Sequence, residues 1–290
     1  IPFEQVVVTS TTHIPFLEML GVEASLTGFP NTAYVSSEKT RKRIDSGLIT
    51  ELGNEEQINT ELLLALKPDA VIGFSLYRNN KMFSTIEKLK IPVIMNGYWL
   101  ETSPLGRAEW IKFFGVLYNK LDEAKRIFDE IEHNYLEAKN LASNAKNRPT
   151  VISGGLFKDI WNLPAGESFE ATFLDHANMD YLFSDSKGKG SLTLTMEAVY
   201  EKAYDADLWF SPSYHESLES MASANEIYTK FKAFNSQKVY SFVNKKGATG
   251  GVIYFELAPA RPDLVLIDLI NIAHPELSDG QGNHFFEVLK

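Results

Sequence analysis

The chain contains the same short sequence pattern twice, and this repetition constrains its fold more than any other feature. NTELLLALKPDAVIGFS covers residues 59–75, and TMEAVYEKAYDADLWFS covers residues 195–211. In each copy a helix-capping residue precedes Glu61 or Glu197 by two positions, and an Asp follows eight residues after that Glu. The pattern predicts a capped helix, a turn and a strand in each copy. We therefore expect two similar lobes.

Short apolar runs and helical patterns alternate on either side of both copies. The apolar runs are nearly continuous and do not alternate with polar residues, which is typical of parallel strands covered on both faces. This indicates an α/β fold with parallel sheets in both lobes. Strands are expected at 6–10, 25–29, 70–74, 92–96, 150–153 and 239–243. Helices are expected at 14–20, 60–66, 223–233 and 261–274, and a helix or a turn at 36–47.

One long helix is predicted between the two halves. Apolar residues recur at steps of three and four over residues 121–146, and the sequence NRP follows. A helix of this length spans roughly 39 Å at ~1.5 Å per residue. The expected organisation is a first α/β lobe at 1–120, a connecting helix at 121–148 and a second lobe at 149–290.

Composition excludes several classes of protein. The chain has 290 residues, no Cys and a formal net charge of −10, so disulfides and Cys-ligated metal sites are ruled out. The acidic balance gives no general attraction to nucleic acid, and we expect no nucleic-acid partner. No uninterrupted apolar run is long enough for a membrane span. The chain begins IPFEQVVV, so we expect any export signal to have been removed.

Enzyme motifs do not fit the sequence. GATGG at residues 247–251 is glycine-rich but lacks the strand, helix and later acidic residue of a dinucleotide site. G-x-S-x-G, Walker A and H-E-x-x-H motifs do not occur in the sequence. We expect a binding protein that is not an enzyme, with a hydrolase or oxidoreductase on a similar α/β scaffold as the less favoured alternative.

Five stretches spread over nearly the whole chain carry a family resemblance. They are VVVTSTTHIPFLEMLG, ELLLALKPDAVIGF, ETSPLGRAEWIKFFGVL, LPAGESFEATFLDHANMDYLF and RPDLVLIDLINIAHPEL. With them the chain resembles class III periplasmic substrate-binding proteins of ABC importers, which bind ferric siderophores, cobalamin or haem. It is most similar to the iron-complex-binding branch of Bacteroidetes-type bacteria. The resemblance implies two Rossmann-like lobes joined by one rigid helix, with a ligand cleft between them.

The resemblance also implies a partner. In relatives one Glu on each lobe docks into an Arg pocket on each of two permease subunits, and Glu61 and Glu197 match those positions. A carboxylate in a helix's first turn is also favoured by the helix dipole, by ~0.3–1 kcal/mol, so capping alone is the alternative. We expect a monomer in the periplasm or cell envelope, delivering an iron complex to an ABC permease dimer. Relatives usually carry a further N-terminal segment, and membrane association is expected only through a lipid anchor absent from this chain.

Ligands of parallel sheets bind beyond the carboxyl ends of the strands. Aromatic side chains mixed with a few cations suit a large, flat, partly anionic ferric catecholate or hydroxamate. Trp99 and Trp161 fit a place in the core equally well, and Arg107 is expected to be structural because it lies on a helix. The expected ligand-binding residues are Thr12, His13, Tyr77, Arg78, Trp99, Lys158, Trp161, Tyr214, His215 and Tyr254.

His13 and His215 each follow a predicted strand and are weak candidates for contact with a metal or a haem iron. Capture of a free metal ion usually needs three or four ligands, and the six histidines do not supply such a set. We therefore expect no resident metal and no intrinsic cofactor. The expected ligand is a ferric chelate, with cobalamin or haem as alternatives. Arg78 and Lys158 are expected to attract an anionic chelate.

Overall fold

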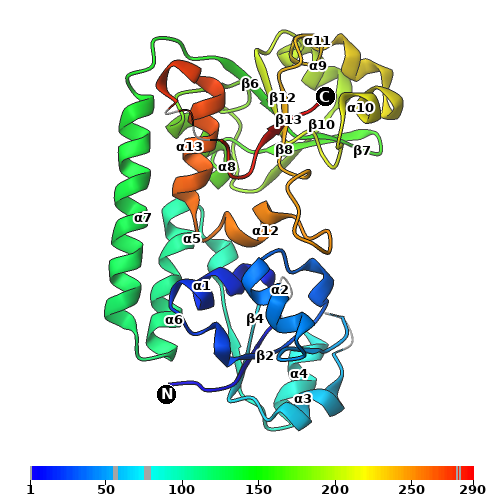
Figure 1. The fold of residues 1–290 in the computed structure, drawn as a ribbon. Helices are drawn as coiled ribbons and strands as arrows, with labels where there is room; N and C mark the ends of the chain where they lie inside the picture. The colour runs from blue at the N-terminus through cyan, green and yellow to red at the C-terminus, as the bar shows by residue number, and fades with distance from the viewer. Residues whose placement is uncertain (1, 55–57, 75–79, 279, 281) are drawn as a thin grey trace. The chain divides into compact units, whose positions relative to one another are not determined.

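The computed structural model describes residues 2–54, 58–74, 80–278, 280 and 282–290, and divides the chain into two units. Each is an α/β unit built on a mainly parallel five-stranded sheet, as predicted (Figure 1). The segment Lys246–Ala260, expected in the second lobe, packs with the first unit. Unit 1 comprises Ile1–Leu100, Gly106–Glu130 and Lys246–Ala260, and unit 2 comprises Glu101–Leu105, Ile131–Lys245 and Arg261–Lys290.

The sheet of unit 1 has the strand order β3-β2-β1-β4-β5, and all four pairings are parallel. Its two central strands, β1 and β4, are buried throughout, and Val7 on β1 is opposite Val71 on β4. Helices cover both faces, which explains why these strands do not alternate with polar residues. The strands are β1 (Val6–Val8), β2 (Leu26–Phe29), β3 (Thr50–Glu51), β4 (Ala70–Gly73) and β5 (Val93–Met95).

The helices of the first part of the chain begin where the capping residues predict. Ser37 caps α2 by accepting a hydrogen bond from the Thr40 amide, and Pro104 begins α5. Trp110 separates α5 from the next helix, α6. These helices are α1 (Ile14–Met19), α2 (Glu38–Asp45), α3 (Thr60–Leu66), α4 (Lys81–Lys88), α5 (Pro104–Glu109), α6 (Ile111–Leu117) and α12 (Ile253–Leu257), with 3₁₀ turns η1 (Thr11–His13), η2 (Glu23–Ser25), η3 (Thr32–Tyr34) and η4 (Tyr98–Leu100).

The long helix α7 (Leu121–Ala142) ends four residues before the predicted end at residue 146. The carbonyl of Asn140 explains the difference, because two side chains compete for it. It accepts hydrogen bonds from Ser143 Oγ at 2.6 Å and Asn144 Nδ2 at 3.1 Å. The Asn144 amide donates to Leu141 O instead, so the helix tightens into a turn and stops. Among the described residues no helix has the length and apolar character to cross a membrane.

Unit 2 contains two sheets. The larger has the order β13-β12-β11-β6-β9, in which β13 is antiparallel to β12 and the other pairs are parallel. The smaller is an antiparallel sheet, β10-β8-β7. The strands are β6 (Thr150–Ser153), β7 (Gly155–Phe157), β8 (Ile160–Pro164), β9 (Asp180–Tyr181), β10 (Ser191–Thr195), β11 (Leu208–Phe210), β12 (Val239–Ser241) and β13 (Glu287–Val288).

Residues 155–164, where the sequence analysis expects no strand, form the β7–β8 hairpin. Its turn is Lys158-Asp159, with Lys158 at φ 57. Tight hairpin turns with positive φ favour Asn-Gly or Asp-Gly. A Lys-Asp pair gives no such signal, so the sequence did not indicate the two strands on either side of the turn.

The prediction of one helix over 223–233 is wrong. Asn225 has extended backbone angles and its side chain accepts a hydrogen bond from the Ile227 amide, which ends one helix and starts a 3₁₀ turn. Phe231 is extended too, so a separate short helix follows. The helices of unit 2 are α8 (Phe169–His176), α9 (Met196–Ala203), α10 (Leu218–Ala224), α11 (Lys232–Asn235) and α13 (Pro262–Ala273), with 3₁₀ turns η5 (Glu226–Lys230) and η6 (Pro275–Leu277).

Candidate ligand-binding site

The carboxyl edge of the unit 1 sheet brings Thr12, His13 and Tyr98 together. Thr12 and His13 lie in η1 directly after β1, and Tyr98 lies in η4 after β5. Ser10 Oγ and Thr12 Oγ1 are 2.8 Å apart, and the rings of His13 and Tyr98 are 6.2 Å apart. Burial raises the pKa of the Tyr98 phenol, so it stays a neutral donor. Hydroxyl groups therefore gather where a ligand of a parallel sheet is expected.

His13 is fully buried, and neither ring nitrogen has a hydrogen-bond partner. Its ring lies 5.6 Å from that of Phe114 and 6.2 Å from that of Tyr98. Burial among these rings lowers the pKa of His13 to about 3. The imidazole is consequently neutral at physiological pH, so it adds no positive charge to this edge.

His13→Phe should change the pH dependence of stability. The pKa of His13 falls from 6.5 to about 3 on folding, so the unfolded chain binds the extra proton between these pH values. The free energy of unfolding of the wild type therefore rises with pH across this window, by a few kcal/mol more than that of the variant. Denaturant unfolding of both proteins from pH 4 to 7.5 measures the difference.

The wild type must be compared with the variant, because Glu256 changes the free energy of unfolding with pH in the opposite direction. Burial raises the pKa of Glu256 to about 7, so its contribution to stability falls as pH rises from about 4.5 to about 7. That contribution is common to both proteins and cancels. A difference curve that stays flat would show that the His13 ring takes up a proton in the folded state.

The other expected residues of unit 1 have different environments. Trp99 is half-buried, and its carbonyl accepts a hydrogen bond from Arg107 at 3.5 Å. Tyr254 lies on α12 and is partly exposed. Tyr77 and Arg78 lie outside the described residues.

The segment 246–260 is held against the loop after β2. A β-carbon at Gly251 would lie 2.1 Å from the Tyr34 carbonyl oxygen, so only glycine fits there. Thr249 Oγ1 donates to Ala33 O at 2.8 Å. Buried Glu256 accepts hydrogen bonds from the amides of Ser36 at 2.7 Å and Ser37 at 2.9 Å. The GATGG motif is thus a packing device for this segment.

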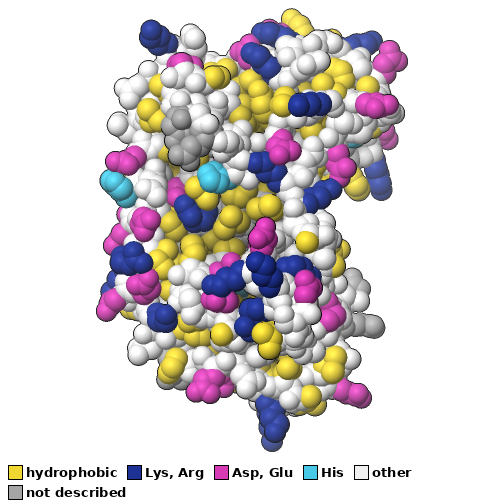
Figure 2. Space-filling view, in the orientation of Figure 1, with side chains coloured by type: hydrophobic (Ala, Val, Ile, Leu, Met, Phe, Trp, Pro, Cys, Tyr) yellow, Lys and Arg dark blue, Asp and Glu magenta, His cyan; other side chains and the backbone are white. Residues whose placement is uncertain are grey.

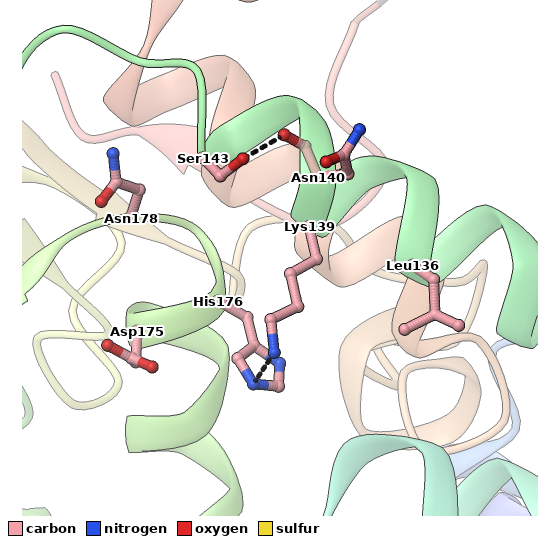
Figure 3. Close-up of a pocket in the computed structure, with 7 residues that line it drawn as sticks. All are labelled: Leu136, Lys139, Asn140, Ser143, Asp175, His176 and Asn178. Carbon is pink, nitrogen blue, oxygen red and sulfur yellow. Dashed lines mark hydrogen bonds between the residues drawn. The ribbon is translucent and has the colours of Figure 1, made fainter.

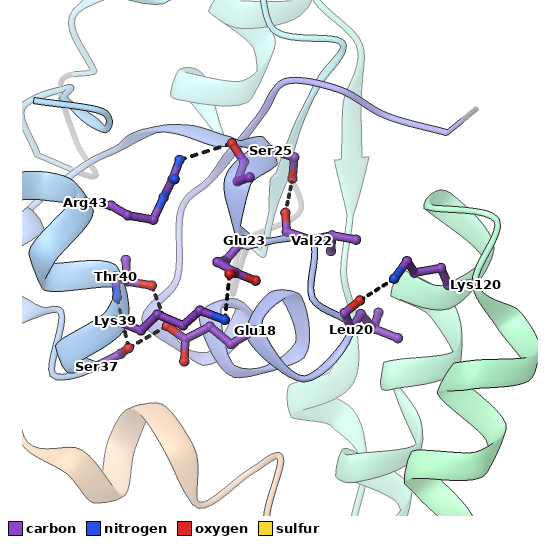
Figure 4. A network of polar contacts seen from close by, with 11 residues as sticks. Glu18, Leu20, Val22, Glu23, Ser25, Ser37, Lys39, Thr40, Arg43 and Lys120 are labelled. Atoms are coloured by element: carbon purple, nitrogen blue, oxygen red, sulfur yellow. Dashed lines mark hydrogen bonds and ion pairs between the residues drawn. The ribbon is translucent and has the colours of Figure 1, made fainter.

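A polar network on the same side of unit 1 fixes the start of α2 (Figure 4). Glu18 accepts hydrogen bonds from the hydroxyls of Ser37 and Thr40, and Lys39 pairs with Glu23 at 2.6 Å. These contacts, with Glu256, position the neighbouring Tyr34, which is 63% exposed. The sequence analysis missed Tyr34. Its position five residues after a strand could have indicated it.

In unit 2, Trp161 is a core residue and does not lie in an open loop. It is fully buried and stacks on Trp209 with ring centroids 5.2 Å apart. Tyr228 and Phe231 pack around it, and Trp161 Nε1 donates to Ser153 O at 3.1 Å. The prediction that Trp161 contacts the ligand directly is therefore wrong. Trp161 packs beneath the carboxyl edge of the sheet and supports it.

Two loops of unit 2 carry the remaining candidates. Tyr214 follows β11 and is 73% exposed, while His215 is half-buried with its ring 5.7 Å from that of Tyr228. Burial lowers the pKa of His215. Lys158 is exposed at the tip of the hairpin. Within the described part of the chain, no three His, Asp or Glu side chains gather as metal ligands would.

Glu61 lies in the first turn of α3 and is exposed. The Asn59 side chain caps this helix by accepting hydrogen bonds from the amides of Glu61 and Leu62. The Asn59 amide donates to Leu52 O just beyond β3, and the Leu52 amide donates to Phe29 O at the end of β2. Glu61 therefore begins a helix that starts from the carboxyl ends of β2 and β3.

Glu197 occupies the corresponding place in unit 2. It is exposed in the first turn of α9, which Thr195 caps by accepting a hydrogen bond from the Ala198 amide. Thr195 is opposite Ile160 in the β8–β10 ladder. The next residue of β8, Trp161, bonds Ser153 at the carboxyl end of β6. The repeated sequence thus builds the same placement twice.

A further cavity lies between α7 and α8 (Figure 3). It has a volume of about 330 Å³, and Lys139 Nζ is 2.8 Å from His176 Nε2 within it. Because Lys only donates, Nε2 accepts and the other ring nitrogen, 2.8 Å from the Tyr135 hydroxyl, carries the proton. Asp180, just after α8, is opposite Thr150 at the start of β6. The cavity is therefore at the opposite edge from the ligand loops.

Two α/β units, each with its loops and an acidic helix start at the carboxyl edge of a parallel sheet, define a class of two-lobed binding proteins. The model of one protein family, described as periplasmic binding protein, matches residues 6–245. The chain belongs to the periplasmic binding protein family.

The chain is also similar to individual proteins. An uncharacterized lipoprotein of Methanocaldococcus jannaschii is 30% identical over 295 residues, covering 99% of this chain and 69% of the relative. A possible iron-binding periplasmic solute-binding protein from Staphylococcus epidermidis has a TM-score of 0.71 at 17% identity, covering 94% of this chain and 100% of that one. A periplasmic heme-binding protein from Pseudomonas aeruginosa has a TM-score of 0.73 at 16% identity, covering 99% and 98%. The two structural likenesses show the fold. Membership of the Bacteroidetes-type branch stays a prediction.

Proposed function

We propose that this protein is the extracytoplasmic binding component of an ABC importer and captures a ferric siderophore or related iron complex for its permease. The observation that carries the proposal is the pairing, in each unit, of ligand loops with an exposed Glu at the same sheet edge. In unit 1 exposed Tyr34 follows β2 and exposed Glu61 follows β3, and in unit 2 exposed Tyr214 follows β11 and exposed Glu197 lies in the first turn of α9. A permease that contacts both Glu residues would also cover the loops that hold the ligand.

Aromatic and hydroxyl side chains support a large organic ligand. Tyr34 and Tyr214 are largely exposed at the carboxyl edges of their units, and both offer a ring face together with a phenol hydroxyl. Such groups suit the flat, oxygen-rich surface of a catecholate or hydroxamate chelate. Arg78 and Lys158 remain proposed attractants for its negative charge. Cobalamin or haem is the alternative ligand, and haem is the ligand named for the Pseudomonas aeruginosa protein of similar fold.

Titration identifies the ligand class. Intrinsic fluorescence and visible absorbance are followed while ferric enterobactin, ferric desferrioxamine, haemin or cyanocobalamin is added. Tight saturable binding of a ferric chelate, with weaker binding of haemin and cyanocobalamin, is the expected result. Tighter binding of haemin or cyanocobalamin would show that this compound, and not a ferric chelate, is the ligand. Turnover of any of the four would favour the enzyme alternative.

Tyr214→Ala should weaken binding of the preferred chelate by about three- to tenfold, because an aromatic contact contributes ~0.7–1.4 kcal/mol. Tyr204→Ala is the matched control. Tyr204 is also an exposed tyrosine of unit 2, but it ends α9 at the opposite edge of the sheet. Calorimetric titration of both variants measures the effect. Equal affinity of the two variants would remove Tyr214 from the site.

The proposed location is the periplasm or cell envelope. The relative from Methanocaldococcus jannaschii is named a lipoprotein, and a lipid anchor would hold this protein at the membrane that contains its permease. We propose a monomer with no nucleic-acid partner and no resident cofactor.

A further inference from the structure

We propose that the tip of the β7–β8 hairpin, residues 157–160, is an apolar anchor that inserts into a recess of the permease subunit receiving Glu197. The inference rests on the proposed function, because it adds a second contact to the docking surface. Phe157 and Ile160 form the last pair of the hairpin, and they are 68% and 51% exposed. Two large apolar side chains held together in water indicate a surface that a partner covers.

Strand register places this tip beside the docking carboxylate. β8 is antiparallel to β10, and Ile160 is directly opposite Thr195. Thr195 is the capping residue of α9, and Glu197 lies in the first turn of that helix. Opposite residues of an antiparallel pair have β-carbons ~4.5–5.5 Å apart. One partner surface can therefore contact the apolar tip and Glu197 at the same time.

The hairpin presents its tip in a fixed conformation. Only two residues form the turn, and Lys158 takes a left-handed conformation with φ 57. The strands behind the tip are anchored in the unit: the Leu156 amide donates to the Tyr228 hydroxyl at 3.0 Å, and Trp161 is buried in the aromatic core. Because the tip is already ordered, the hairpin loses little conformational entropy when a partner binds it.

The charges around the hairpin tip indicate what kind of partner binds it. Glu197 and Glu201 are exposed four residues apart on α9 and so share a helix face, while the turn residues Lys158 and Asp159 carry opposite charges. The whole chain has a formal net charge of −10. An anionic lipid surface or a second copy of this chain would be repelled. A membrane protein with basic side chains around an apolar recess fits both features.

The same combination occurs in unit 1. Next to Glu61 on α3, Leu62 is 40% exposed and Leu64 is 44% exposed. Each docking carboxylate therefore has exposed apolar side chains as neighbours, although different elements supply them. A two-fold permease would meet a carboxylate with an apolar contact on both of its subunits.

The double variant Phe157→Ser with Ile160→Ser tests the anchor. The ligand-free protein is bound to its permease–ATPase complex in nanodiscs, and affinity is measured by biolayer interferometry. A loss of at least tenfold is expected, equivalent to about 1.4 kcal/mol, with an unchanged melting temperature and chelate affinity. Leu136→Ser removes an apolar side chain of α7 that is 50% exposed, as exposed as Ile160, and should have no effect.

A photo-crosslinking residue at position 157 identifies the occupant in cells, and a crosslink to a permease subunit is expected. Crosslinks to lipid or to a second copy of the chain would overturn the proposal. Wild-type permease affinity of the hairpin variant, together with loss of affinity in Glu61→Ala/Glu197→Ala, would refute the anchor while docking stands. Wild-type affinity of both double variants would refute docking itself.

Discussion

The double variant Glu61→Ala/Glu197→Ala is expected to lose import of the iron complex while keeping its affinity for that complex. Both carboxylates are exposed at the starts of matched helices. Truncating one partner of a charge pair that becomes buried typically costs ~2–5 kcal/mol, so permease affinity should fall by well over tenfold. Uptake of radioactive iron chelate by complemented cells measures import, and titration of the purified protein measures affinity.

Glu219→Ala is the matched control for the helix-dipole alternative. Glu219 is exposed in the first turn of α10, which Ser217 caps, but it lies outside the repeated sequence. If first-turn carboxylates only stabilise helices, all three positions should lose similar small amounts of stability, ~0.3–1 kcal/mol, without loss of import. Normal import by the double variant would reject docking. Loss of chelate affinity would show that these Glu residues belong to the ligand site.

The repeat predicted local structure well because its signals are local. The helix at 60–66 was predicted with the bounds that α3 has, and Asn59 and Thr195 cap α3 and α9. Capping and strand burial are encoded within a few residues, so a single sequence contains them. The parallel sheet followed from the continuous apolar strands, such as Val6–Val8, which is buried throughout.

Features that depend on distant contacts were not predictable. Glu256 bonds residues about 220 positions away, and Gly251 is required by the Tyr34 backbone. The local sequence GATGG shows only flexibility, and it cannot show what the glycines pack against. The assignment of 246–260 to the second lobe therefore failed. Lys158-Asp159 likewise lacks the turn signal that would have revealed the β7–β8 hairpin.

For the candidate ligand residues, the position relative to the sheet was predictable from local sequence, but burial was not. The rule of the carboxyl edge located Thr12, His13 and Tyr214, because it depends only on strand order and direction. Burial depends on which side chains surround a residue in three dimensions, so the sequence could not separate exposed Tyr214 from buried Trp161. Tyr34 lies on the loop after β2, where none of the predicted ligand residues lies.

Trp161→Ala is expected to cost ~3–5 kcal/mol of folding stability, the range for removing a large aromatic side chain from a core. Trp161 is fully buried against Trp209, Tyr228 and Phe231, and its Nε1 bonds Ser153 O. The variant would leave a cavity and an unpaired carbonyl beneath the loops of unit 2. Guanidinium unfolding followed by circular dichroism measures the loss.

Trp161→Phe separates packing from ligand contact. The variant keeps an aromatic ring against Trp209 but loses the bond from Nε1 to Ser153 O. It should recover part of the stability, and its chelate affinity should equal that of the wild type under conditions where both are folded. A core residue affects binding only by unfolding the unit, whereas a residue in contact with ligand would change affinity in the folded protein. Wild-type stability of Trp161→Ala combined with weaker chelate binding would therefore return Trp161 to the ligand site.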